Sequence, residues 1–337
     1  MAAPPAAPKE KAISEEEAAL YDRQIRLWGA AAQSRLQAAR VLLAGRFRGI
    51  AVDAAKNIVL AGVGGLTLLD GEDLAVEDLG SNYFARGEEV GRRCVEASAP
   101  RIQALNPRVN LATETDYVKL FDKDFLKSFD LVVVTDVDAP TVLKVNDLTR
   151  ELGKKFFAAG SVGIDGWMFA DLLDHEFVVD VHKSVQHGET QVVPTKSVAG
   201  YVPFSLALEH KFGKLRKREL NKTGPVLWGT LSLFAAQRAL NPSPSQATPT
   251  IISEEQLKSA AEELLPQKGV TADLLPADEL SRLATLQDAE FAPSCAIVGG
   301  ILGQDILNCV GGKEEPLRNM GFFEGATGQF RVWQMGL

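Results

Sequence analysis

The chain has 337 residues, of which 46% are hydrophobic and 24% charged, and its formal net charge is −8. This length allows two domains, or one larger α/β domain with an insertion, and the composition supports a full hydrophobic core. The excess of acidic residues argues against nucleic acid as the main partner. The longest uncharged stretches, of which Thr223 to Gln237 is one, are shorter than the roughly 20 apolar residues that span a bilayer. We therefore expect no transmembrane helix.

The N-terminus and the cysteines indicate the compartment. Residues 1–12 are rich in Ala and Pro and lack the apolar segment of a secretory signal, so we expect a disordered tail there. Only three cysteines occur, Cys94, Cys295 and Cys309, and their spacing fits neither a disulfide framework nor a zinc site. The four histidines show no metal-binding spacing either, and we expect no metal site. These features predict a soluble protein of a reducing, intracellular compartment.

The first half of the chain alternates short apolar runs with helical patterns. Ser14 and Glu17 have the spacing of a capping box, so we expect one helix from Ser14 to about Gly29, and a shorter helix over 31–39. The expected strands are 40–45, 66–70, 109–115 and 130–136, and the expected helices between them are 51–62 and 91–105. Strands separated by helices of this length indicate βαβ units. We predict a Rossmann-like, doubly wound, mostly parallel sheet.

The pattern changes from about Val181 and returns after Phe291. The middle segment is polar and holds a basic stretch at 211–222, and helical patterns that occupy 226–240 and 253–265. The closing segment holds a Gly-rich helix over 293–309 and two strands over 321–325 and 328–334. We expect Gly299 and Gly300 to allow close helix packing. The predicted division is a tail (1–12), a Rossmann-like part (13–180), a mainly helical insertion (181–290) and a closing part (291–337).

The turn after the first strand has the position of a nucleotide-binding loop. A working dinucleotide loop has the form G-x-G-x-x-G, because its glycines let the backbone approach the pyrophosphate. Here Gly45 and Gly49 are separated by Arg46, Phe47 and Arg48, and Ala51 stands in the third glycine position. We interpret the loop as degenerate and structural, with an unusual working loop as the alternative. Asp70, at the end of the next strand, would hold a ribose or make a turn.

The segment Tyr21-Asp-Arg-Gln-Ile-Arg-Leu-Trp-Gly29 resembles the ubiquitin-activating enzyme superfamily, and within it most closely the small subunits of heterodimeric SUMO-activating enzymes. The similarity covers roughly 13–180 and 290–332 and is weak across the insertion. Its further matching segments are 54–70, 76–98, 105–110, 169–178 and 292–306. The resemblance implies a ThiF/MoeB-like adenylation fold. It also implies that two such halves pair, and that only one half binds ATP and magnesium and adenylates the modifier.

Comparison with a working half places this chain in the degenerate half. Where a working half has S-N-x-N-R-Q, this chain has Ser81-Asn82-Tyr83-Phe84-Ala85-Arg86, so an asparagine and an arginine are replaced. The lysine that approaches phosphate aligns with Cys94, and a thiol cannot stabilise phosphate charge at neutral pH. The resemblance therefore implies that ATP and magnesium belong to the partner and that this chain alone holds no cofactor.

The cysteine that accepts the modifier lies in the inserted domain of a working half. Residues 99–294 contain no cysteine, so the insertion resembles a remnant of that domain and the transfer cysteine belongs to the partner. The resemblance identifies Arg23 with an arginine that the inactive half places into its partner's ATP site, where a guanidinium suits phosphate oxygens. Arg26 would assist, while Tyr21 and Trp28 are expected to pack. The alternative is that Arg23 has no role in the reaction and lies on a solvent-exposed face of its helix.

The expected function is that of a required but non-catalytic subunit of a SUMO-activating heterodimer. Its partners would be the large catalytic subunit, SUMO and, indirectly, the SUMO-conjugating enzyme, in the nucleus and cytoplasm. The isolated chain would be inactive. The basic stretch 211–222 would be a nuclear-import signal, a contact for an acidic protein or a solvated surface. The alternatives are the small subunit of another ubiquitin-like pathway, a nicotinamide-dependent oxidoreductase, which the loop sequence argues against, and a pure scaffold.

Overall fold

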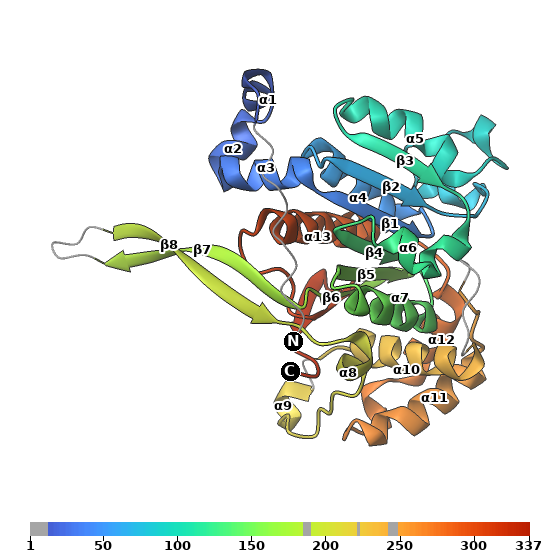
Figure 1. The fold of residues 1–337 in the computed structure, drawn as a ribbon. Coiled ribbons are helices and arrows are strands. Elements are labelled where there is room, and N and C mark those ends of the chain that lie inside the picture. The colour runs from blue at the N-terminus through green and yellow to red at the C-terminus, as the bar shows by residue number, and fades with distance from the viewer. Residues whose placement is uncertain (1–12, 185–189, 221–222, 242–248) are drawn as a thin grey trace.

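A computed structural model describes residues 13–184, 190–220, 223–241 and 249–337, and the tail expected at 1–12 lies outside this range. Its centre is one eight-stranded sheet (Figure 1). The strands are β1 (Arg40–Gly45), β2 (Gly65–Leu69), β3 (Asn110–Glu114), β4 (Leu131–Thr135), β5 (Lys155–Val162), β6 (Asp165–Asp171), β7 (Asp174–Ser184), β8 (Thr190–Gly200), β9 (Met320–Glu324) and β10 (Gln329–Trp333). The order in the eight-stranded sheet is β10-β9-β6-β5-β4-β1-β2-β3, while β7 and β8 pair with each other in a separate two-stranded sheet.

The sheet confirms the predicted Rossmann-like class. Neighbouring strands from β3 through β2, β1 and β4 to β5 run parallel, while β6, β9 and β10 add an antiparallel edge. The central strands β1 and β4 are apolar runs, and β4 is buried along its whole length. Continuous apolar runs are typical of parallel strands that helices cover on both faces.

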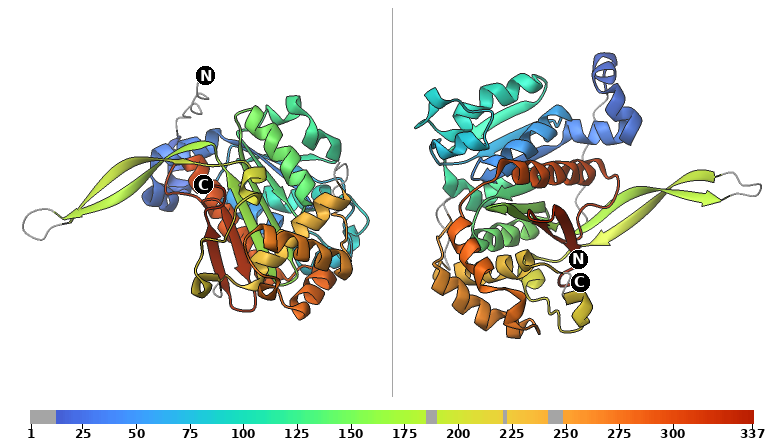
Figure 2. Two further views of the ribbon diagram at one scale, coloured as in Figure 1. Left: turned by 90° about the horizontal axis from the view of Figure 1, so that it is seen from below. Right: turned by 180° about the vertical axis from the view of Figure 1, so that it is seen from behind.

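Helices form a layer on each face of the sheet (Figures 1 and 2). The helices before the insertion are α1 (Glu15–Leu20), α2 (Asp22–Trp28), α3 (Ala30–Ala38), α4 (Gly49–Leu60), α5 (Cys94–Leu105), α6 (Lys123–Leu126) and α7 (Ala139–Glu151). The later helices are α8 (Phe204–Leu208), α9 (Lys217–Leu220), α10 (Pro225–Leu240), α11 (Glu254–Gln267), α12 (Ala277–Leu286) and α13 (Ala292–Gly311). Short 3-10 turns are η1 (Glu77–Gly80), η2 (Gly87–Glu89), η3 (Tyr117–Phe121) and η4 (Ala272–Leu274).

The predicted N-terminal helix begins where it was expected but is not continuous. The capping box is present, because the amide of Glu17 donates to Ser14 Oγ at 3.2 Å and the amide of Ser14 donates to Glu17 Oε2 at 3.0 Å. The single helix expected up to Gly29 is instead two helices, α1 and α2, which meet at Tyr21. Burial of the Tyr21 side chain against the body outweighs local helix propensity at that residue.

The segment after β6 also departs from the prediction. A polar insertion was expected from 181, but β7 and β8 form an antiparallel ribbon that projects from the body, so the expected boundary falls inside β7. Along β7, His175 and Phe177 are buried while Glu176 between them is exposed, which is the alternation of a strand. Beyond the ribbon, α8 to α12 form the helical part that was expected.

The closing helix α13 packs along α4. A Cβ added at Gly299 would come within 2.7 Å of the carbonyl oxygen of Ile50, so this glycine permits the close approach that was expected. Gly300 faces open space, and the same expectation was wrong for it. Among the described residues, α13 is the one helix long and apolar enough to cross a membrane. Its contacts with α3 and α4 are those of a core helix of this fold.

Candidate functional site

The loop between β1 and α4, residues 45–49, lies where a Rossmann fold binds phosphate. The amides of residues 46–49 already have partners within the chain. The amide of Phe47 donates to Asp70 Oδ2 at 2.9 Å, and the amide of Gly49, the first residue of α4, donates to Glu290 Oε1 at 3.2 Å. A carboxylate at a helix N-terminus takes the place that an anionic ligand would occupy. The loop is therefore filled from inside.

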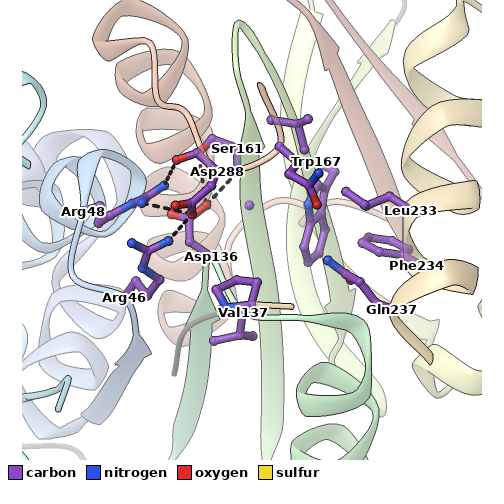
Figure 3. Close-up of a pocket in the computed structure, with 14 residues that line it drawn as sticks. Arg46, Arg48, Asp136, Val137, Ser161, Trp167, Leu233, Phe234, Gln237 and Asp288 are labelled. Atoms are coloured by element: carbon purple, nitrogen blue, oxygen red, sulfur yellow. Dashed lines mark hydrogen bonds and ion pairs between the residues drawn. The ribbon is translucent and has the colours of Figure 1, made fainter. Parts of the chain in front are cut away.

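The two arginines of the loop are also engaged. Arg48 Nε donates to Glu290 Oε1 at 2.9 Å, and Arg46 Nε donates to Glu72 Oε2 at 3.1 Å. Both guanidinium groups also contact Asp288 (Figure 3), and the side chains of both arginines are largely buried. Buried charge that is already paired within the chain is unavailable to a ligand.

The space left beside the loop is too small for a nucleotide. The cavity drawn in Figure 3 has a volume of about 30 Å³, and since one water needs about 10–15 Å³ of such volume, it has room for two or three water molecules. Asp136 lies at its edge with φ of 51° and accepts hydrogen bonds from the amide and hydroxyl of Ser161 at 2.8 and 3.1 Å. Trp167 and Phe234 close the opposite side.

The electrostatic character of the loop region is acidic. Burial raises the pKa of Asp70 to about 7, although the amides of Phe47 and Glu72 donate to it. Burial and the neighbouring Asp136 raise the pKa of Glu290. A buried carboxyl group at this place offers no positive charge to a polyphosphate, and in its ionised form it repels one. Asp70, with both oxygens accepting backbone amides, fits the turn alternative for that residue.

Cys94 lies directly beneath the same loop. Its thiol donates to the carbonyl oxygen of Phe47 at 3.3 Å, and Asn82 Nδ2 donates to Ser98 Oγ at 3.1 Å beside it. Burial raises the thiol pKa of Cys94 well above its ordinary value. Cys295 and Cys309 are buried as well. A buried thiol with a raised pKa is a poor nucleophile.

Arg23 lies at the other end of α4 from this loop. It belongs to α2, whose Gln24 contacts the last residue of α4, Leu60, while the loop precedes the first. Figure 1 shows α1 and α2 standing out from the body. The side chain of Arg23 is exposed and forms no ion pair within the described part of the chain, whereas Arg26 is paired with Asp22 at 3.0 Å. The geometry does not bring Arg23 to its own chain's loop.

The packing roles expected for the two aromatic residues of this segment are confirmed. Tyr21 is buried, and Trp28 packs partly buried against the core that includes α4 and α13. Sequence reasoning missed Glu290 and Asp288, which fill the loop. They precede α13 and lie about 240 positions from the arginines they contact, so no local pattern connects them. The sequence signal for an acidic partner of the loop was this pair of acidic residues just before the closing helix.

Comparison with known proteins decides the family. The ThiF family matches residues 21–336. The chain belongs to the ThiF family. SUMO-activating enzyme subunit 1 of Xenopus laevis is 36% identical over 337 residues, which cover 95% of this chain and 96% of the relative. The human SUMO-activating enzyme subunit 1 is 37% identical over 344 residues, which cover 96% of each. The chain thus belongs to the branch of the ThiF family that holds SUMO-activating enzyme subunit 1.

Solved structures agree with the ThiF fold at low sequence identity. The crystal structure of PaaA has a TM-score of 0.56 and 14% identity, and covers 97% of this chain and 76% of the PaaA chain. A crystal structure of E. coli MccB has a TM-score of 0.53 and 13% identity, and covers 94% of this chain and 71% of the MccB chain. At this level of identity the likeness concerns the fold alone.

Proposed function

We propose that this chain is a required but non-catalytic subunit of a SUMO-activating heterodimer. The observation that carries the proposal is the closed loop at 45–49, where Asp70 and Glu290 occupy the amides that a nucleotide phosphate would need. A ThiF-family chain with this loop filled from inside needs a second adenylation-type subunit to bind ATP and magnesium. That partner would adenylate the C-terminus of SUMO and carry the transfer cysteine.

The contribution of this chain to the reaction would be Arg23, supplied in trans. Its side chain is exposed on a projecting helix, and its own loop lies at the far end of α4. A guanidinium placed against the polyphosphate would offset negative charge as pyrophosphate leaves. The thioester formed on the partner would then pass SUMO to the SUMO-conjugating enzyme.

The test is reconstitution of the heterodimer. This chain and the large SUMO-activating subunit are purified separately and together, and SUMO thioester is measured on the large subunit with ATP and magnesium. We expect stable co-elution and a reducible SUMO adduct that requires both chains. A large subunit that forms the adduct equally well alone would overturn the proposal, as would thioester on this chain.

The alternatives are weaker. A subunit of another ubiquitin-like pathway would show the same loop, and replacing SUMO by those modifiers in the assay separates the two. The nicotinamide alternative conflicts with the 30 Å³ cavity and with the engaged amides. A pure scaffold would still assemble with the large subunit, but substitution of Arg23 would then leave the rate of adenylation unchanged.

We also propose a nuclear as well as cytoplasmic location, carried by the basic stretch 211–222. In its described part, Phe212 is buried against Trp228 and Trp333 and fixes the segment, while Lys211, Lys214 and Arg218 are exposed. Replacing these three exposed cations by alanine in a fluorescent fusion should reduce nuclear accumulation. Unchanged accumulation would identify the stretch as a solvated surface.

A further inference from the structure

The helix that carries Arg23 is held to the body by few contacts. No residue of α2 is fully buried, and its apolar packing on the core comes from the partly buried Trp28 at its C-terminal end. The contacts that hold it lie at its two ends and at Gln24 between them. All of them lead to residues 59–62, which are the last two residues of α4 and the two that follow. The exposed carbonyls of a helix end are unsatisfied within the helix and accept such contacts.

Tyr21 makes the strongest of these contacts. It stands between α1 and α2, and only 3% of its surface is exposed. Its ring packs on Gly62, where a Cβ would come within 2.4 Å of the tyrosine hydroxyl. Asn106 Nδ2 donates to this hydroxyl at 2.9 Å and also to the carbonyl oxygen of Val59 at 3.0 Å. One side-chain amide therefore joins the start of α2 to the end of α4.

The other end of α2 has a second, weaker brace. Trp28 Nε1 donates to Gln33 Oε1 at 3.0 Å, and Gln33 Nε2 donates to the carbonyl oxygen of Ala61 at 2.9 Å. Between the two ends, Gln24 Nε2 donates to the carbonyl oxygen of Leu60 at a longer 3.3 Å. The three contacts with α4 set the angle at which α2 leaves the body.

We infer that the Tyr21 hydroxyl, held by Asn106, is a positioning group for Arg23. The inference rests on the proposed role of Arg23 in trans. Arg23 follows Tyr21 by two residues, and a displacement of about 1 Å at a charged group costs a large factor in rate. The hydroxyl itself is buried and touches no reacting atom, so it acts through the direction of α2.

The experiment is a double-mutant cycle in the reconstituted heterodimer with SUMO and ATP. Tyr21→Phe keeps the ring on Gly62 and removes only the hydroxyl bonded to Asn106. Losing one neutral hydrogen bond changes an equilibrium or rate constant about two- to tenfold. We expect the rate of ATP–pyrophosphate exchange to fall by this factor. In the Arg23→Ala background, Tyr21→Phe should have no further effect, because the group that it positions is gone. Hydrogen exchange of the amides of residues 15–28 should become faster in Tyr21→Phe.

Tyr117→Phe is the matched control, since Tyr117 is also buried but belongs to the other core cluster. It should leave the exchange rate unchanged. Normal exchange by Tyr21→Phe, beside a slow Arg23→Ala complex, would overturn the inference and leave the proposed function intact. Full additivity of the two changes would also overturn it, because Tyr21 would then act independently of Arg23. Normal exchange by Arg23→Ala would instead remove the proposed role of Arg23.

Discussion

The carboxylate of Glu290 accepts a hydrogen bond at 3.2 Å from the amide of Gly49, the residue that opens α4 after the first strand. The same carboxylate pairs with Arg48 at 2.9 Å. A phosphate in a working loop of this kind would use the same backbone amide at the start of the helix. The side chain of Glu290 thus takes the place of a phosphate. Its contacts also connect the segment before α13 to the turn between β1 and α4.

The isolated chain should not bind ATP. Its loop amides and arginines are paired within the chain, and burial raises the pKa of Asp70, which accepts a hydrogen bond from the amide of Phe47, to about 7. Calorimetry with ATP and magnesium should show no binding at micromolar nucleotide. The large partner subunit, titrated in the same buffer, serves as the positive control. Micromolar affinity for the chain alone would contradict the degenerate-loop interpretation.

Glu290→Ala should destabilise the chain by about 2 to 4 kcal/mol, because it removes a partner of the buried Arg48 and leaves the Gly49 amide without an acceptor. Urea unfolding measures the change. Glu279→Ala is the matched control, since Arg282 keeps its second partner Asp165 at 2.6 Å. The control should cost no more than about 1 kcal/mol. Equal losses in the free energy of unfolding would mean that the contacts of Glu290 with the loop stabilise the chain no more than a surface ion pair does.

Replacing Cys94, Cys295 and Cys309 together by alanine should leave SUMO thioester formation by the heterodimer intact. All three thiols are buried, and burial raises the pKa of each. We expect packing losses of about 1 kcal/mol per site in stability and no loss of the reducible adduct. Disappearance of the adduct from a complex that still assembles would place the transfer cysteine on this chain.

Asp305→Asn should stabilise the chain at neutral pH. Burial raises the pKa of Asp305 to about 6, while the amide of Leu317 donates to it at 2.9 Å, a contact that an asparagine oxygen preserves. The folded chain therefore binds more protons than the unfolded one between about pH 4 and 6, and the native protein loses stability as the pH rises through this window. The advantage of Asp305→Asn should be full above pH 6 and vanish towards pH 4. A difference independent of pH in urea unfolding would contradict this ionisation.

Local sequence patterns predicted the parts of the fold that local chemistry determines. The strand at 40–45 was placed at its observed residues because a buried parallel strand is a continuous apolar run. The helical pattern over 253–265 likewise placed the start of α11, where Ser253 and Gln256 form both hydrogen bonds of a capping box within one turn.

The features that were missed depend on distant contacts. The break at Tyr21 follows from Gly62 and Asn106, which no local pattern around Tyr21 contains. The contact of Glu290 with Gly49 spans 241 positions, so the loop sequence showed that a phosphate would fit poorly but not what fills its place.

Arg23→Ala in the purified heterodimer tests the central claim most directly. Its side chain is exposed and Arg→Ala changes helix propensity little, so folding and pairing should survive, which gel filtration checks. Removing one well-placed donor costs about 10²- to 10³-fold in rate, and partial exposure softens this to tens of fold. Arg23→Lys should recover only part, because an ammonium lacks the planar fork. The measurement is ATP–pyrophosphate exchange in the presence of SUMO. We predict exchange slowed by tens of fold or more in an intact complex, whereas exchange at the native rate would contradict a role for Arg23 in the partner's site.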